Sequence, residues 1–257
     1  MQAQVSLTYR CNLKCRHCYL GSLREQKQDE EMGFSFIKDI LTQLSQAGYL
    51  WLALSGGEPL LREDFPEIYR DAKSKGFLIT ILTNATLITP AYIELFREYP
   101  PFYLDITINA LSPNLYDEIC QVQGANEKLL DGLHLLRAGN IPFKLKANLM
   151  RINSQEIANI KKLTERWGVP FNVDPVLFPC LDKSTTPEVC RSSDGAQNPH
   201  LRCAAGKFSV HIDNFGMLRA CEFLREPAFD LKRRSLEEGL TLIAEAVKMR
   251  SLKKVLK

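Results

Sequence analysis

The sequence predicts an α/β fold built on a parallel sheet. Six short apolar runs with the character of strands alternate with five segments in which apolar residues recur at helical spacing. Four of the five helical segments stop at a glycine that leads into the next apolar run. Strands that alternate with helices in this way pair in parallel through right-handed crossovers. The sheet is then either open and doubly wound or curved into a barrel.

The expected elements occupy the chain as far as residue 174. The six strands are expected at 5–9, 51–54, 77–82, 102–108, 142–148 and 171–174. The five helices are expected at 37–47, 66–75, 91–97, 127–138 and 155–167. A strand that is apolar throughout, such as 51–54, is typical of a sheet covered on both faces. Such sheets carry their catalytic side chains at the carboxyl ends of the strands.

The composition fits one large domain, with or without a small appendage. The 257 residues are 45% apolar and 25% charged, and the formal net charge of +3 is too small to indicate a nucleic-acid partner. No apolar run approaches the roughly 20 residues of a membrane span, so no membrane association is expected. No secretory leader precedes the first strand, and the eight cysteines therefore predict a cytoplasmic protein with metal-binding thiols.

Three cysteines lie within eight residues directly after the first expected strand. Cys11, Cys15 and Cys18 have the spacing Cys-x3-Cys-x2-Cys, which lets one loop wrap a single inorganic cluster. A cubane [4Fe–4S] cluster normally takes four cysteines, so three would leave one iron open to a ligand that reacts. A structural zinc site is the alternative, because paired cysteines also bind zinc and His17 is available as a fourth ligand.

A second motif, Gly56-Gly57-Glu58-Pro59, follows the second expected strand, about forty residues after the cysteines. Two glycines let the backbone approach a ligand closely, and a carboxylate beside them can meet an ammonium group. Together the two motifs resemble those of the radical S-adenosylmethionine (SAM) enzymes, and the pair disfavours the zinc interpretation. His17 stands where that family usually has an aromatic residue, which is a mild departure.

The resemblance implies a partial (β/α)6 barrel, similar to a TIM barrel, and the six expected strands agree with it. It also implies that Cys11, Cys15 and Cys18 ligate a catalytic [4Fe–4S] cluster whose open iron binds SAM. An electron passed into the sulfonium would release a 5′-deoxyadenosyl radical, which abstracts hydrogen from the substrate. In the family the Gly-Gly-Glu-Pro segment binds the amino group of SAM, so residues 56–59 are expected to bind this cofactor.

Polar residues near the ends of the other strands are further candidates for the cofactor pocket. The resemblance makes Thr83 and Asn84 pocket residues, although Ala85 stands where the family commonly has glycine. Tyr19, directly after the cysteines, and Asn148, at a strand end, are expected to contact SAM, and Thr107 and Asn109 are expected to contact SAM or substrate. Several of these polar residues are equally suited to ordinary turns.

The composition changes after the expected barrel, which divides the chain into a core at 1–178 and a C-terminal region at 179–257. In the latter, a small β-hairpin lies within a Cys-x12-Gly-x4-Cys pattern formed by Cys203 and Cys221, and a helix follows. The pattern resembles the opening half of a SPASM or twitch domain, in which these cysteines ligate a second [4Fe–4S] cluster. Two buried hairpin thiols are the alternative.

The resemblance to a SPASM domain is incomplete, because its later cysteines do not follow here. Either the region is a shortened form, or the second cluster takes further ligands from Cys180 and Cys190. Cys120 lies in an amphipathic segment and is expected to be a packed core thiol.

The expected activity is therefore reductive cleavage of SAM followed by hydrogen abstraction. The SPASM-like region implies a peptide or protein substrate, and a flavodoxin or ferredoxin would be the reductant. One alternative is a radical SAM step in cofactor biosynthesis, on a molybdopterin- or haem-type intermediate. The other is an accessory protein that holds a cluster without turnover.

Overall fold

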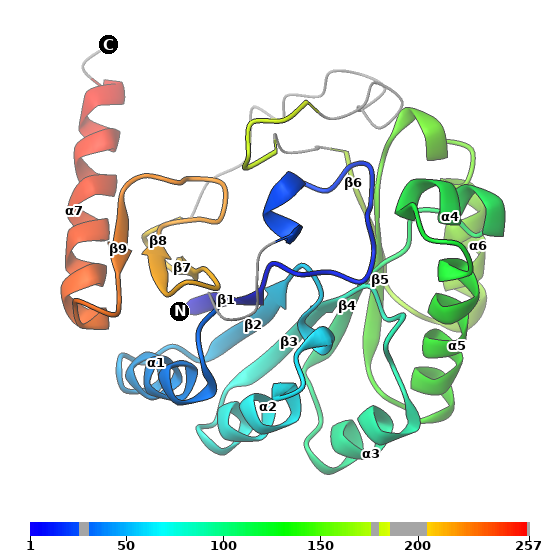
Figure 1. Cartoon of the computed structure of the whole chain (residues 1–257), viewed down its shortest axis with the longest axis horizontal. Helices are drawn as coiled ribbons and strands as arrows, with labels where there is room; N and C mark the ends of the chain where they lie inside the picture. Colours follow the sequence, from blue (N-terminus) through cyan, green and yellow to red (C-terminus); the bar gives the residue numbers. More distant parts are fainter. Residues whose placement is uncertain (26–30, 176–179, 186–204, 256–257) are drawn as a thin grey trace.

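The structure is a computed structural model that describes residues 1–25, 31–175, 180–185 and 205–255. The strands in these ranges form one sheet, in the order β6-β5-β4-β3-β2-β1-β7-β8-β9. Its first six strands follow the expected ranges: β1 (Gln2–Thr8), β2 (Trp51–Gly56), β3 (Leu78–Thr83), β4 (Tyr103–Thr107), β5 (Phe143–Asn148) and β6 (Phe171–Asp174). Each pairs in parallel with the next. The predicted α/β class is confirmed, and the sheet curves without closing (Figure 1).

Helices cover the convex face of this sheet, while its concave face holds the N-terminal loop (Figure 1). The helices between strands are α1 (Phe34–Gln46), α2 (Phe65–Ser74), α3 (Pro90–Glu98), α4 (Pro113–Cys120), α5 (Ala125–Ala138) and α6 (Ile157–Trp167). In α1 the residues at helical spacing, Ile37, Leu41 and Leu44, are all buried. The helical periodicity of the sequence therefore comes from contact with the sheet. Among the described helices, none has the length and apolar character that a bilayer span requires.

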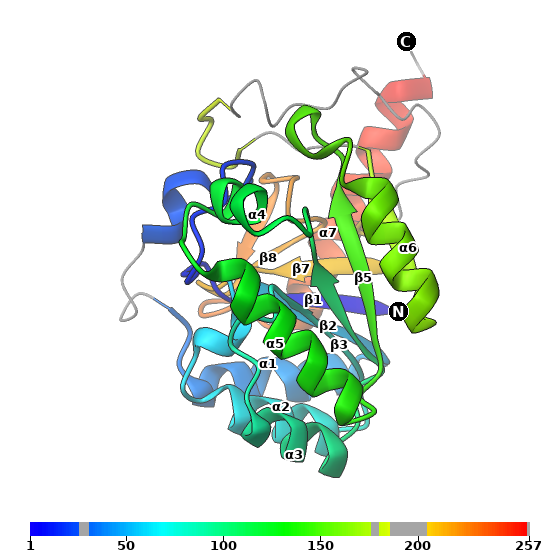
Figure 2. The same ribbon diagram turned by 90° about the vertical axis from the view of Figure 1, so that its right-hand side faces the viewer.

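Of these six α-helices, α4 is the one that the periodicity does not predict. Its eight residues make only about two turns, too few for an apolar repeat to stand out. It ends at Gln121, which adopts the left-handed conformation with φ of 54°. Tyr116, Ile119 and Cys120 are its buried residues, so Cys120 is a packed thiol as expected. Figure 2 shows α4 beside the N-terminal segment that follows β1.

The C-terminal region extends the same sheet. Strand β7 (Ser209–Ile212) pairs in parallel with β1, and β8 (Met217–Arg219) returns antiparallel to it, which gives the expected hairpin. Strand β9 (Ala228–Asp230) and helix α7 (Leu236–Val255) follow. The predicted division of the chain at residue 178 lies outside the described residues and stays a prediction, while β1 of the core and β7 belong to one sheet.

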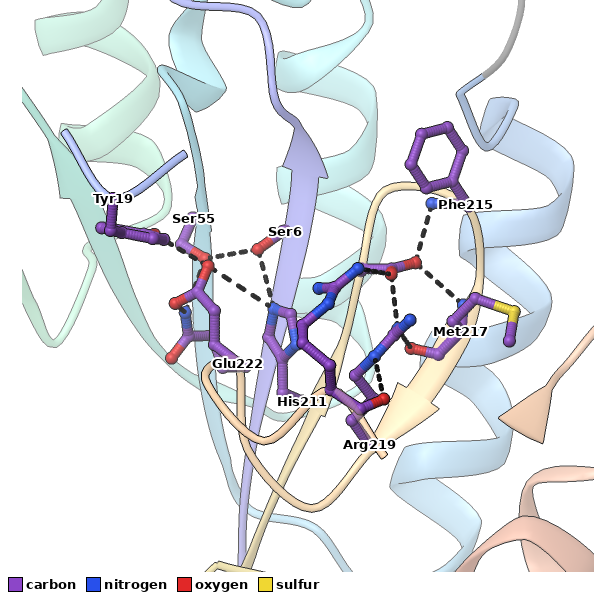
Figure 3. A network of polar contacts seen from close by, with 11 residues as sticks. Ser6, Tyr19, Ser55, His211, Phe215, Met217, Arg219 and Glu222 are labelled. Atoms are coloured by element: carbon purple, nitrogen blue, oxygen red, sulfur yellow. Dashed lines mark hydrogen bonds and ion pairs between the residues drawn. The ribbon is translucent and has the colours of Figure 1, made fainter. Parts of the chain in front are cut away.

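A buried ion pair holds the turn of this hairpin (Figure 3). The Asp213 carboxylate accepts a hydrogen bond from Arg219 Nη1 at 2.5 Å and is completely buried. It also accepts hydrogen bonds from the backbone N–H groups of Phe215 and Met217, both at 3.0 Å. These hydrogen bonds fix the turn around the Asp213 carboxylate. Opening the turn would break them and leave a buried charge uncompensated, which is costly.

The close packing of α5 against the loop after β3 predicts a site that is sensitive to one added methyl group. A Cβ atom at Gly132 would lie 2.3 Å from the backbone oxygen of Ala85. Gly132→Ala is therefore expected to lower the free energy of unfolding by about 1–3 kcal/mol. The loss is expected even though alanine is more favourable than glycine inside a helix by roughly 1 kcal/mol. Denaturant unfolding measures the effect. Asp131→Ala, at the exposed neighbouring position, is the control, and equal losses in the two variants would contradict the prediction.

Candidate functional site

A cavity of about 320 Å³ lies at the carboxyl ends of the parallel strands. Five consecutive strands contribute their last residues to its wall: Gly56, Thr83, Thr107, Asn148 and Asp174. The loop after β1 contributes Cys11, Cys15 and Cys18. The structure therefore brings the three cysteines and the predicted strand-end residues to one place. Tyr19, Gly57, Asn84 and Asn109 also line this cavity.

The three cysteines are half-buried and their thiols are free. Burial, the largest cause, raises the pKa of Cys11 to about 12 and that of Cys18 to about 11 in the metal-free chain. Iron binds the thiolate form, so loading a cluster here would release protons. Three thiols from one short loop that line one cavity are the donor set of a cluster bound from one side and open on the other, although the described side chains do not converge on one metal position in this structure.

The Gly-Gly turn packs directly on the backbone that leads into the cysteine loop. Gly57 N–H donates to the Thr8 oxygen at 2.8 Å, and Glu58 N–H donates to the Arg10 oxygen at 2.9 Å. Gly56 has φ of 146°, and a Cβ atom there would lie 2.0 Å from the Thr8 oxygen. The glycines therefore permit backbone to approach backbone, a contact that the sequence analysis did not consider.

Glu58 is fully buried and does not line the cavity. Its carboxylate accepts hydrogen bonds from Thr83 Oγ1 and Asn84 N–H, both at 2.7 Å, and from Leu60 N–H at 3.1 Å. Burial raises its pKa to about 7, and these three hydrogen bonds oppose the rise. In this structure the carboxylate orders the Thr83–Asn84 segment. A direct contact with SAM, from Glu58 or from Pro59 behind it, stays a prediction.

Asn109 connects the cysteine loop with the end of β5. Its side-chain nitrogen lies 3.2 Å from His17 Nε2, and its side-chain oxygen accepts from Asn148 N–H at 2.9 Å. Asn153, from the turn after β5, donates in turn to the backbone oxygens of Asn109 and Asn148. Burial lowers the pKa of His17 to about 4, with a smaller contribution from Arg24. The imidazole at this wall of the cavity is therefore neutral at pH 7.

The C-terminal region supplies one wall of the cavity through Glu222 and Phe223. Glu222 accepts hydrogen bonds from Tyr19 OH at 2.7 Å and from Gln4 Nε2 at 3.0 Å (Figure 3). Burial raises the pKa of this carboxyl, against the opposing effect of the two donors. Next to it, His211 Nε2 lies 2.9 Å from Ser6 Oγ on β1.

Several residues of the cavity wall are not predicted by the sequence. They share no motif and meet only in the folded chain: Gln4, Ser55, Tyr116, Lys146, Asp174, Glu222 and Phe223. For Asp174 a signal was present, because it is the last residue of an expected strand. For Glu222 the sequence holds no such signal, since its partners Gln4 and Tyr19 lie more than 200 residues away.

The remaining cysteines lie in different places. Cys180 Sγ is 3.6 Å from the Cys18 backbone oxygen, beside the N-terminal loop. Cys221 directly follows Ala220 at the end of the hairpin and is half-buried. Cys190 and Cys203 lie outside the described residues, so the ligand set of a second cluster stays a prediction.

The family profile described as "Radical SAM superfamily" matches residues 5–164, more than half of the chain. The chain belongs to the radical SAM superfamily. It is thus an enzyme of that class, and the family implies a [4Fe–4S] cluster and SAM as cofactors. The matched residues include both motifs of the cavity, the cysteine loop and the Gly-Gly-Glu-Pro turn.

Curated relatives within this superfamily carry different names. An "AdoMet-dependent heme synthase" from Methanosarcina barkeri is 32% identical over 162 residues, which are 63% of this chain and 46% of the relative. A "Probable GTP 3′,8-cyclase" from Methanothermobacter marburgensis is 30% identical, over 68% of this chain and 57% of the relative. A "PqqA peptide cyclase" from Xanthomonas oryzae is 26% identical, over 63% of this chain and 44% of the relative. The chain spans about half the length of these relatives.

Solved structures of radical SAM proteins share the fold. SuiB from Streptococcus suis bound to S-adenosylmethionine has a TM-score of 0.76 at 15% identity, covering 91% of this chain and 64% of SuiB. SuiB bound to the precursor peptide SuiA has a TM-score of 0.70 at 14% identity, and the match covers 95% of this chain and 64% of SuiB. The protein anSMEcpe with bound AdoMet has a TM-score of 0.69 at 14% identity, and the match covers 92% of this chain and 76% of anSMEcpe.

The buried carboxyl of Glu58 predicts a pH-dependent stability of the metal-free chain. Because its folded-state pKa of about 7 lies above the ordinary 4.5, the folded state binds more protons than the unfolded state between these values. The free energy of unfolding should therefore fall as the pH rises from about 4.5 to 7. Relative to wild type, Glu58→Gln should remove a component on the order of 3 kcal/mol from this fall.

Urea unfolding at a series of pH values measures the difference between the two chains. Glu63→Gln, which changes an exposed carboxyl in the same segment, is the matched control. Parallel profiles for wild type and Glu58→Gln would show that the carboxyl stays ionised in the folded chain.

Proposed function

We propose that this radical SAM enzyme cleaves SAM reductively at a cluster held by Cys11, Cys15 and Cys18, and modifies a peptide or protein. The observation that carries the proposal is the shared cavity, in which the three thiols face the last residues of five parallel strands. When bound, the cluster supplies the electron that divides SAM into methionine and a 5′-deoxyadenosyl radical. Hydrogen abstraction from the substrate then yields 5′-deoxyadenosine.

The residues of the chain bind and orient the reactants in this proposal. The turn at Gly56 and Gly57 places backbone polar groups at the cavity wall beside the cysteine loop. Thr83 and Asn84, held by Glu58, add a hydroxyl and an amide, and Thr107, Asn109 and Asn148 add further polar groups from the next two strands. Such groups suit the ammonium, carboxylate and ribose of SAM. Tyr19, which lines the same cavity, is also proposed to contact SAM.

A peptide substrate is supported by two of the comparisons. One relative is named a peptide cyclase, and one of the structures that share the fold holds a precursor peptide. The hairpin with Cys221 resembles the opening half of a SPASM or twitch domain, and we propose that Cys203 and Cys221 ligate a second cluster. A flavodoxin or ferredoxin is the proposed reductant, in a cytoplasmic setting that keeps the thiols reduced.

Cofactor biosynthesis is the second candidate function. It is supported by the relatives with higher identity, the haem synthase at 32% and the GTP cyclase at 30%. These matches cover 63% and 68% of this chain, so they bear on the cluster and SAM rather than on the C-terminal wall.

Anaerobic reconstitution with iron and sulfide tests the proposed function. With dithionite and SAM, the wild-type chain is expected to form 5′-deoxyadenosine, detected by liquid chromatography. Cys15→Ala is expected to give no product above background, because a cubane with two protein ligands is not held. Product formation by Cys15→Ala at the wild-type rate, or none by the reconstituted wild type, would refute the proposal.

Iron analysis of the same samples tests the second cluster. About four irons per chain indicate the catalytic cluster alone, and about eight indicate two clusters. If the wild-type chain holds about eight irons, Cys221→Ala is expected to hold about four. Formation of 5′-deoxyadenosine by this variant would show that the catalytic cluster is still present.

A further inference from the structure

We propose that the outer edge of β6 is the docking site of the peptide substrate, which pairs with this strand in an extended conformation and reaches the cavity from there. The inference rests on the proposed function, in which the substrate is a peptide or protein. It assigns the place where the peptide binds and the pattern of side chains that the peptide carries.

Strand β6 is an end strand of the sheet, and β5 is its partner on the inner side. Leu149 N–H donates to the backbone oxygen of Asp174 at 2.8 Å, so the backbone groups of Asp174 face β5. Alternate residues of a parallel strand direct their N–H and C=O groups to opposite sides. The backbone groups of Val173, and those of Phe171 two residues earlier, therefore point away from β5.

These outward groups are accessible and have no partner in the part of the chain that the structure describes. No hydrogen bond joins the outer side of Phe171 or Val173 to another described residue. Val173 is 38% exposed, and Asn172 is exposed as well. Two residues thus offer donors and acceptors in the arrangement that an extended peptide uses when it joins the edge of a sheet.

A hollow of about 560 Å³ lies between this strand and α6. The side chains of Ile157, Phe171 and Val173 form apolar parts of its wall. Two exposed charged residues also line it, Lys161 and Glu165, and they pair with each other at 4.0 Å. Because these charges balance, the hollow suits a large uncharged side chain such as that of leucine or phenylalanine.

The alternation of side chains along a strand connects the hollow with the cavity. Phe171 and Val173 line the hollow, whereas Asp174 lines the cavity that holds the three thiols. Neighbouring strands present their side chains to the two faces of a sheet in the same alternation. A peptide beside β6 therefore places one residue in the hollow and the next toward the cavity. A large apolar residue is expected at an odd number of positions from the residue that is modified.

Peptide binding to the anaerobically reconstituted full-length chain, with SAM present, tests the inference. The probes are sequences selected on the wild-type chain from a phage-displayed library of random linear peptides. Val173→Pro removes the outward N–H and keeps the ladder with β5, because an edge strand tolerates proline where the N–H faces away from its partner. Val173→Ala, the matched control, shortens the same side chain and keeps the N–H. Val173→Pro is expected to bind the selected peptides about tenfold more weakly than Val173→Ala.

Hydrogen exchange of the wild-type chain is a second measurement, which does not depend on how Val173→Pro folds. A selected peptide is expected to slow the exchange of the amide groups of Phe171 and Val173. Equal affinity of the two variants for every selected peptide, or slowed exchange only at other strands, would overturn the inference. Enrichment of no peptide would overturn it too and would count against a peptide substrate. Formation of 5′-deoxyadenosine by the same chain would then still support cleavage of SAM.

Discussion

The site depends on the contact between two stretches of backbone, the turn after β2 and the segment between β1 and the cysteine loop. Two hydrogen bonds, from Gly57 to Thr8 and from Glu58 to Arg10, fix this contact, and only residues without a Cβ atom permit it at Gly56 and Gly57. The two sequence motifs of the superfamily are thus parts of one structural unit. A side chain at either glycine would separate the cysteines from the strand ends that complete the cavity.

Around this contact the polar residues of the wall hold one another. Glu58 orders Thr83 and Asn84, and Asn109 orders His17 and the end of β5. Most of these groups use their hydrogen-bonding capacity on protein partners, which fixes their positions before any ligand binds. Fixed polar groups reduce the ordering that a ligand must otherwise impose when it binds.

The sequence predicts the parts of this structure that local pattern encodes. Alternating strands and helices, the spacing of Cys11, Cys15 and Cys18, and the Gly-Gly-Glu-Pro turn all leave a signal within a few residues. Helix α4 and Glu222 leave none, because a helix of two turns has too little periodicity and a carboxylate at position 222 meets Gln4 only after folding. The motif leads to the expectation that Glu58 meets the ammonium group of SAM, but it does not encode the hydrogen bonds to Thr83 and Asn84, which lie about 25 residues later in the chain.

The place of β7 has a consequence for the strand that leads into the cysteines. Because β7 covers one edge of β1 and β2 covers the other, β1 is an interior strand whose amide groups are satisfied on both sides. A chain cut before the hairpin would turn β1 into a sheet margin, open to fraying and to pairing with other molecules. The hairpin therefore acts as a brace for the metal-binding loop, whatever its own cysteines bind.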